Sequence, residues 1–245
     1  RSAGGSARRA DTGLSAVLDP AAIRGDPRYA LCRPMAPGAP RMSDNDATLV
    51  IRLEQPRWLH DWTRQPAPAA DDRERLAEVL GLAREHVEHG GGGPFAAVVY
   101  RIDTRERLGA AVNTTIASCC AAAHAELQAL SLAQQRIGCH SLAALPCVLV
   151  SSSAPCTMCL GAIAWSGVQR LVFCTPRQDV EAIGFDEGPA TPRWRRELQR
   201  RGIAVRGPLL RRQGQAILQR YVERGGPIYN GPLATDPSPH KAEPA

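Results

Sequence analysis

The strongest constraint on the fold of this chain is a pair of short motifs that lie far apart in the sequence. His124 is followed two residues later by Glu126, and a second motif, Pro155-Cys156 with Cys159, begins about thirty residues further on. One imidazole and two thiolates can hold a zinc ion and leave its fourth position open to water. The fold must therefore bring two distant segments together at one metal ion.

The positions of the cysteines and the glutamate suit hydrolytic chemistry. Pro155 is tolerated in the first turn of a helix, so Cys156 and Cys159 are predicted at a helix start and on one helix face. Free amides and the helix dipole stabilise thiolates at such a start. We expect Glu126 to carry protons, because a further carboxylate ligand would fill the open position on the metal.

Each motif alone has a simpler interpretation. A C-x-x-C pair that follows a strand is also typical of a thioredoxin-like redox centre. It could be half of a structural zinc site, although the sequence holds no second C-x-x-C. A single histidine is usually a hydrogen-bonded polar group, and a first-turn glutamate is a favourable partner of the helix dipole. The two motifs together, in this order, favour a catalytic zinc site with one ion per chain.

The bulk composition predicts a cytoplasmic protein with one core. The chain has 245 residues, of which 44% are hydrophobic, and this is enough for one well-buried core. No apolar run reaches the roughly 20 residues of a membrane span, and no charged-then-apolar leader opens the chain. The chain is too long for a disulfide-stapled small domain, so most of its other cysteines are expected to be small buried residues in a reducing compartment.

The location of the charge argues against a nucleic-acid partner. The formal net charge is +6. Residues 1–41 hold seven arginines and three aspartates and so supply +4, which leaves 23 basic and 21 acidic residues, or +2, for the rest of the chain. Strong phosphate binding requires clustered positive charge, and the part of the chain that carries the metal motifs is nearly neutral.

Hydrophobic periodicity and turn residues predict helices that alternate with strands, which indicates a layered α/β sandwich. The predicted helices span 72–89, 120–135, 155–165, 194–201 and 217–222. The predicted strands span 95–100, 108–112, 147–150, 171–174 and 203–205.

Several segments besides the metal motifs carry a family resemblance. In order along the chain they are Gly93–Val99, Asn113, Ala123–Glu126, Cys156–Gly167, Ile183–Pro189 and Gly225–Asn230. The H-x-E…P-C-x-x-C pattern marks zinc nucleobase deaminases as a group. The Gly-Phe-Asp-Glu loop and the Ile-Tyr-Asn segment make the chain resemble a bacterial guanine deaminase of the cytidine-deaminase-like superfamily. The resemblance implies a three-layer α/β/α sandwich with a mixed sheet of about five strands, and a homodimer.

The resemblance also assigns roles to individual residues. It implies that Phe95 stacks on a purine and that Asn113 hydrogen-bonds it. Glu126 and Glu187 would be the catalytic acids and bases. The other expected substrate contacts are Ala125, Trp165, Asp186 and Tyr229. The sequence departs from many members at Ala154, where they carry a glutamate, and this difference concerns the hydrogen bonds beside the metal.

The implied reaction is hydrolysis of guanine to xanthine and ammonia, a step of purine catabolism. Other aminated bases stay open as substrates, namely a triazine such as ammeline, cytosine or cytidine, and adenosine in tRNA. Two different classes also stay open: an inactive binding protein that keeps the fold, and a redox module built on Cys156 and Cys159. The expected organisation is a disordered extension over 1–49, a linker near 66–70, a zinc-dependent deaminase domain over 50–231 and a disordered tail over 232–245.

Overall fold

The computed structural model describes residues 51–65, 71–189 and 191–230. The expected N-terminal extension, the linker at 66–70 and the C-terminal tail lie outside the described residues. The helices are α2 (Arg57–Arg64), α3 (Asp72–His89), α4 (Ala125–Ile137), α5 (Thr157–Ser166), α6 (Arg177–Glu181), α7 (Trp194–Arg200) and α8 (Arg211–Glu223). The strands are β1 (Ala96–Arg101), β2 (Arg107–Val112), β3 (Cys147–Ser153), β4 (Arg170–Thr175) and β5 (Ala204–Arg206).

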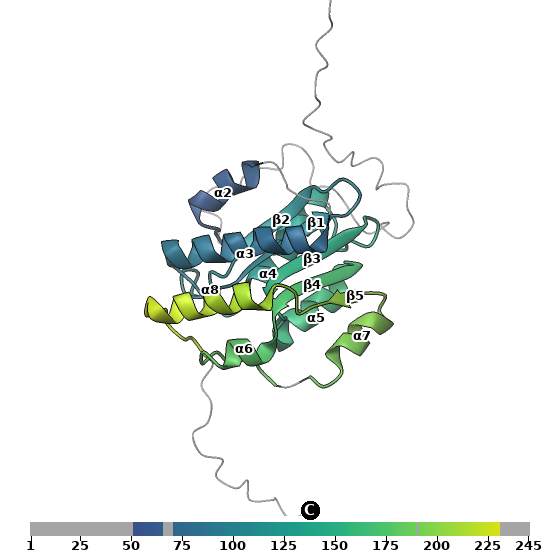
Figure 1. Cartoon of the computed structure of the whole chain (residues 1–245). Coiled ribbons are helices and arrows are strands. Elements are labelled where there is room, and N and C mark those ends of the chain that lie inside the picture. Colours follow the sequence, from purple (N-terminus) through teal and green to yellow (C-terminus); the bar gives the residue numbers. More distant parts are fainter. Residues whose placement is uncertain (1–50, 66–70, 190, 231–245) are drawn as a thin grey trace, which may run out of the picture.

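The strands form one mixed sheet in the order β2-β1-β3-β4-β5 (Figure 1). β1 pairs antiparallel with both β2 and β3, while β3, β4 and β5 run parallel to one another. The parallel strands are joined by helices, as a crossover between parallel strands requires. The predicted mixed sheet of about five strands is confirmed.

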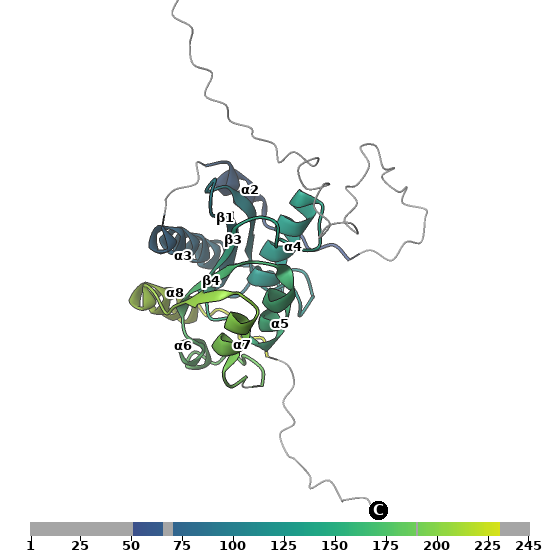
Figure 2. The same ribbon diagram turned by 90° about the vertical axis from the view of Figure 1, so that its right-hand side faces the viewer.

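Both faces of the sheet are buried, and β1 shows this directly. Val98 and Tyr100 point into one apolar core, while Ala97 and Val99 point into the other, as the two-residue period of a strand dictates. Helices α3 and α8 cover the first face, and α4 and α5 cover the second (Figure 2). The predicted three-layer α/β/α sandwich is confirmed.

Some element boundaries differ from the sequence prediction. Helices α2 and α6 were not expected, and Leu59 and Trp62 of α2 are part of the first core, so this core begins before residue 71. Helix α4 begins at Ala125, not near residue 120, because residues 115–122 form turns whose backbone groups bond to one another. Strand β3 continues through Ser153, because its serines pair with β4.

Side chains cover part of the sheet edge formed by β2. Gln55 accepts a hydrogen bond from the Val112 N–H (2.8 Å), and Arg136 of α4 donates to the Arg107 carbonyl (2.7 Å). Capping a backbone group at each end of β2 in this way hinders pairing with another strand. Within the described residues, every helix is too short or too polar to cross a lipid bilayer.

The scattered cysteines follow the expectation only in part. Cys147 and Cys174 are buried in the two cores, and burial raises the pKa of Cys147 to about 12 and that of Cys174 to about 11. Cys119, in contrast, is exposed in a turn with a positive φ of 47°.

Candidate metal centre

Two helix starts meet at one end of the sheet and bring the predicted metal ligands together. His124 is the N-cap residue of α4 and Cys156 is the N-cap residue of α5, both with extended backbone. Cys159 lies in the first turn of α5 and is fully buried. The predicted convergence of one imidazole and two thiols is therefore present.

The spacing of the three side chains suits zinc. His124 Nδ1 lies 3.5 Å from Cys156 Sγ and 3.7 Å from Cys159 Sγ, and all three ligand atoms lie within 4.8 Å of one another. A tetrahedral zinc ion with bonds of typical length would separate a bound nitrogen from a bound sulfur by about 3.6 Å. His124, Cys156 and Cys159 would therefore hold the ion, and they leave a fourth tetrahedral position.

Buried polar groups fix the approach to each helix start. Gln128, one turn into α4, donates from Nε2 to the Ala123 carbonyl (2.8 Å) and to the Val112 carbonyl (3.2 Å). It thereby ties the residue before His124 to the end of β2. At α5, the Thr157 N–H donates to the Glu187 carbonyl (3.2 Å), so a loop carbonyl replaces the usual side-chain cap.

Glu126 lies beside the three metal ligands but is not a fourth ligand. Its Oε1 accepts a hydrogen bond from Ser151 Oγ (3.1 Å), and its Oε2 lies 3.6 Å from Cys159 Sγ. The side chain is buried, and burial followed by the negative charge of Cys156 raises the pKa of the carboxyl group. A carboxyl group with a raised pKa can accept and return a proton.

Hydrogen bonds among the two thiols and the imidazole shift the pKa of each group. Hydrogen bonding from Cys159 and from His124 lowers the pKa of Cys156 to about 4 against the effect of burial. The same pairing with Cys156, together with burial, raises the pKa of Cys159. Burial works to lower the pKa of His124, but the bond and charge of Cys156 outweigh it and the pKa is raised. A dication bound between the sulfurs would displace these protons.

The loop after α6 adds a second carboxyl group. Glu187 is 8% exposed, and burial, then the charges of Cys156 and Glu126, raise its pKa to about 8. Its neighbour Asp186 is exposed and accepts a hydrogen bond from the Gly188 N–H (2.8 Å). Asn230 closes this loop, because its Oδ1 accepts from the Asp186 N–H (2.8 Å).

Three aromatic rings gather beside these carboxyl groups. Phe185 makes edge contacts with Phe95 (ring centroids 5.2 Å apart) and with Tyr229 (5.1 Å). The Tyr229 hydroxyl is buried against the backbone of Gly93, and no side chain among the described residues hydrogen-bonds it. It packs so closely on Gly93 that a Cβ atom there would lie 2.1 Å away.

Asn113 presents a hydrogen-bond donor. It is 1% exposed, its N–H donates to the Phe95 carbonyl (3.0 Å) and its Oδ1 accepts from the Thr115 N–H (3.1 Å). Because Oδ1 is already used, the Nδ2 group, which has no partner among the described residues, is the part of the amide that remains for a ligand.

Ala125 and Trp165, two of the predicted substrate contacts, lie in different environments. Ala125 is the first residue of α4, so its N–H has no partner within the helix and can be offered to a ligand. Trp165 is 78% exposed, and in the described part of the chain no ring contact or hydrogen bond joins it to the other predicted site residues. Its place in a pocket wall remains a prediction.

Sequence reasoning gave no role to three residues that organise the site. They are Gln128, Ser151 and Phe185. The only signal for Ser151 was three consecutive serines after an apolar strand, which is unusual for a strand end that is fully buried. The contacts of Gln128 and Phe185 join segments 5 to 90 residues apart, and periodicity does not detect such pairs.

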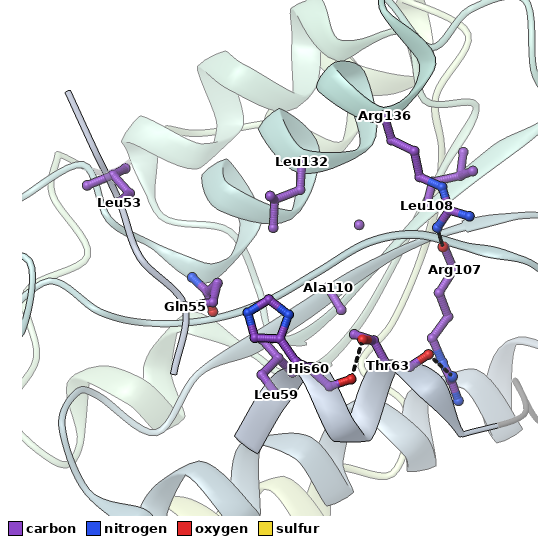
Figure 3. A pocket seen from close by; sticks show the side chains of 11 residues that line it. Leu53, Gln55, Leu59, His60, Thr63, Arg107, Leu108, Ala110, Leu132 and Arg136 are labelled. Carbon is purple, nitrogen blue, oxygen red and sulfur yellow. Dashed lines mark hydrogen bonds between the residues drawn. The ribbon is translucent and has the colours of Figure 1, made fainter. Parts of the chain in front are cut away.

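A separate cavity of about 510 Å³ lies away from the metal triad, between α2, the outer strand β2 and α4. Leu59 and His60 of α2 face Leu132 and Arg136 of α4 across it (Figure 3). Its lining includes no metal ligand or predicted site residue, so we assign the chemistry to the metal centre.

Comparison with known proteins supports the interpretation of the site. Residues 70–175 match the family model described as cytidine and deoxycytidylate deaminase zinc-binding region. The guanine deaminase of Bacillus subtilis is 34% identical over 112 residues, which are 46% of this chain and 69% of that protein. The structure of a guanine deaminase from Nitrosomonas europaea is 42% identical, with a TM-score of 0.67, and the match covers 74% of this chain and 98% of that one. A further structure, of NE0047 in complex with 2,6-diaminopurine, is also 42% identical, with a TM-score of 0.69 and coverage of 74% and 97%.

Proposed function

The chain belongs to the cytidine and deoxycytidylate deaminase zinc-binding family, and on that premise we propose that it hydrolyses guanine to xanthine and ammonia. The observation that carries the proposal is the metal triad of His124, Cys156 and Cys159 with the buried Glu126 beside it. The likeness to the guanine deaminase of Nitrosomonas europaea over nearly its whole length supports guanine as the substrate within the family.

Water supplies the oxygen of xanthine, and the exocyclic amine of guanine leaves as ammonia. When bound, the zinc ion acts as a Lewis acid that makes water nucleophilic near neutral pH. Glu126 accepts the proton of the attacking water, passes it to a ring nitrogen and then assists protonation of the leaving amine. Ser151 holds one oxygen of Glu126, so the other oxygen faces the metal ligands. Glu187, with its raised pKa, is a second group that can donate a proton.

Recognition of guanine rests on hydrogen bonds and stacking. Guanine offers O6 and N7 as acceptors, and the free Nδ2 of Asn113 and the free N–H of Ala125 are donors that match them. Phe95 supplies a ring for stacking. The buried hydroxyl of Tyr229, which no side chain engages, is a further polar group for a purine beside it. A base that lacks these groups would leave buried donors unpaired, which is the main source of discrimination.

Ammonia release from a panel of bases tests the proposal. The panel contains guanine, adenine, cytosine, cytidine and ammeline, with an adenosine-containing tRNA stem-loop as the nucleic-acid member. We expect guanine to give the highest kcat/KM. Turnover of cytidine or of the stem-loop with guanine inert would refute the choice of substrate.

Replacement of the proton carrier separates an enzyme from a binding protein or a redox module. We expect Glu126→Gln to lower kcat by at least about 10²-fold, while zinc content by elemental analysis stays at one ion per chain. Unchanged turnover would refute the role of Glu126. Absence of zinc from the active wild-type protein would instead favour chemistry at the two cysteines alone.

We also propose that the chain acts as a homodimer. Helix α5 carries no charged residue, yet it exposes Met158 and Trp165, which lie seven residues apart and so share one face. An uncharged helix face of this kind usually packs against another surface. Sedimentation of the wild-type protein and of Trp165→Glu tests this proposal, and we expect the variant to sediment as a monomer.

A further inference from the structure

A buried histidine contacts Asn113, the asparagine that we propose hydrogen-bonds the base. His86, in the last turn of α3, is 2% exposed, and its Nε2 lies 2.8 Å from the carbonyl oxygen of Asn113. It is not one of the metal ligands, and the reaction described above does not use it. The site therefore contains a polar contact that the chemistry leaves unexplained.

The geometry fixes the protonation of this ring. A carbonyl oxygen can only accept, so Nε2 carries the hydrogen and donates it to Asn113. Nδ1 is then an acceptor, and it is buried with no hydrogen-bond partner among the described residues. Burial lowers the pKa of His86 despite the bond to Asn113. The ring is thus a neutral donor whose one hydrogen bond goes to the Asn113 backbone.

The chain packs tightly around this hydrogen bond. A Cβ atom at Gly92 would lie 1.9 Å from the Asn113 oxygen and 2.9 Å from His86 Nε2. No side chain fits at position 92, because backbone cannot move aside as a flexible side chain can. The glycine segment that ends α3 therefore allows His86 to reach Asn113.

Asn113 is held from three directions. Its N–H donates to the Phe95 carbonyl, its Oδ1 accepts from Thr115, and its carbonyl accepts from His86. Of these contacts, only the one from His86 comes from the helix layer that covers the first face of the sheet. The same peptide unit is held at its other end by the Thr114 N–H, which donates to the Ala123 carbonyl (3.0 Å). Loss of the His86 contact would leave this unit held at one end only and would let the Asn113 amide shift relative to the metal ligands.

We propose that His86 is a positioning residue for base recognition, which holds the Asn113 amide where it donates to the purine. This role rests on the proposed deaminase function. It predicts that His86 affects binding of the base more than the proton transfers, because Glu126 is held separately by Ser151. A neutral hydrogen bond of this kind, and the orientation it secures, correspond to roughly ten-fold in affinity.

The test compares four variants of the full chain: His86→Leu, His86→Gln, Asn113→Ala and the double variant of His86→Leu with Asn113→Ala. The amide of Gln can replace the Nε2 donor, and Leu cannot. His89→Gln is the matched control, because His89 lies in the same turn and stacks on Trp58 at 4.9 Å but is half-exposed. The measurements are KM and kcat for guanine, the Kd of 8-azaguanine by calorimetry, zinc content and the circular dichroism spectrum.

We expect His86→Leu to raise KM and the Kd of 8-azaguanine by about ten-fold, with a much smaller change in kcat. His86→Gln should recover most of this loss, and His89→Gln should behave as the wild type. In the Asn113→Ala background, His86→Leu should cause no further change in Kd, because its effect passes through Asn113.

Two results would overturn the proposal. One is an equal additional loss of affinity from His86→Leu in the Asn113→Ala background. The other is a loss confined to kcat, with KM and Kd unchanged. If His86→Leu does not fold, His86→Met and His86→Met combined with Asn113→Ala supply the same comparison, because Met also lacks the donor. A wild-type protein that is inactive on guanine would refute the proposed function, whereas an active one with His86→Leu at wild-type Kd would refute only the role of His86.

Discussion

Ser151 and Ser152 are adjacent in β3 but have different partners. Their variants therefore distinguish an effect on the orientation of Glu126 from an effect on stability. Ser151 Oγ donates to Glu126 (3.1 Å), while Ser152 Oγ accepts from the Ala96 N–H (3.1 Å). We expect Ser151→Ala to lower kcat by about five- to ten-fold, because the buried carboxylate loses the partner that orients it. Steady-state kinetics with guanine measures this effect.

Ser152→Ala is the matched control, since it removes a hydroxyl from the same buried strand without touching Glu126. It should lower the melting temperature and leave kcat near the wild-type value. An equal fall of kcat in both variants would mean that Ser151 acts only by supporting the strand.

At the scale of the elements, one carboxylate joins α6 to the start of α8. Asp179 accepts two hydrogen bonds from Arg211 (2.7 and 2.8 Å), and Arg211 lowers the pKa of Asp179 below its ordinary 3.8. A lowered folded-state pKa means that the unfolded chain binds the proton more readily. The stabilisation is therefore complete above the ordinary pKa and is lost as the pH falls through the lowered value.

Asp179→Asn should consequently lower the melting temperature by a few degrees at pH 7. The difference from the wild type should shrink progressively below pH 4, because the wild-type carboxylate is then protonated as well. Glu181→Gln, which removes a half-exposed partner of Arg177 from the same helix, should have little effect. A difference for Asp179→Asn that stays constant down to pH 2 would contradict the charge-based account.

The elements that could be predicted are those whose signal is local. The continuous apolar run of β1 and the periodicity of α3 each reflect burial along one segment, and a motif of four residues locates Cys156 and Cys159. Helix α2 was missed because it is short and depends on tertiary contacts, such as the Arg107 guanidinium 4.5 Å from the centre of the Trp62 ring. The start of α4 was misplaced because an apolar run of alanines resembles a helix even where turns form.

The residues of the site also divide into those that the local sequence reveals and those that it does not. His124 and Glu126 can be recognised from the sequence because they lie two residues apart, in a motif whose residue types indicate the chemistry. Gln128, Ser151 and His86 were not found, because each acts on an atom that only the folded chain brings near. Sequence therefore locates the reacting groups, and structure is needed for the groups that orient them.

Across the whole molecule, a buried ionic cluster holds the end of the sheet opposite the metal centre. Asp72, whose side chain is 3% exposed, pairs with Arg75 (3.3 Å), Arg170 (3.0 Å) and Arg206 (2.6 Å). These residues come from α3, β4 and β5. Arg170 begins β4, whereas the ligand Cys156 follows the far end of β3. The cluster thus joins three elements and lies away from the chemistry.

Asp72→Ala should lower the free energy of unfolding by about 3–5 kcal/mol, because it leaves a buried charge without its partner. The cost comes from Arg75, which is 2% exposed, since Arg170 and Arg206 can turn toward solvent. Urea unfolding measures it, with Asp103→Ala as the control for an exposed pair, where less than about 1 kcal/mol is expected. If unpaired charge is the cause, adding Arg75→Met to Asp72→Ala should restore part of the stability. A double variant that is less stable than Asp72→Ala would instead assign the loss to packing around Tyr100, over whose ring Arg75 lies.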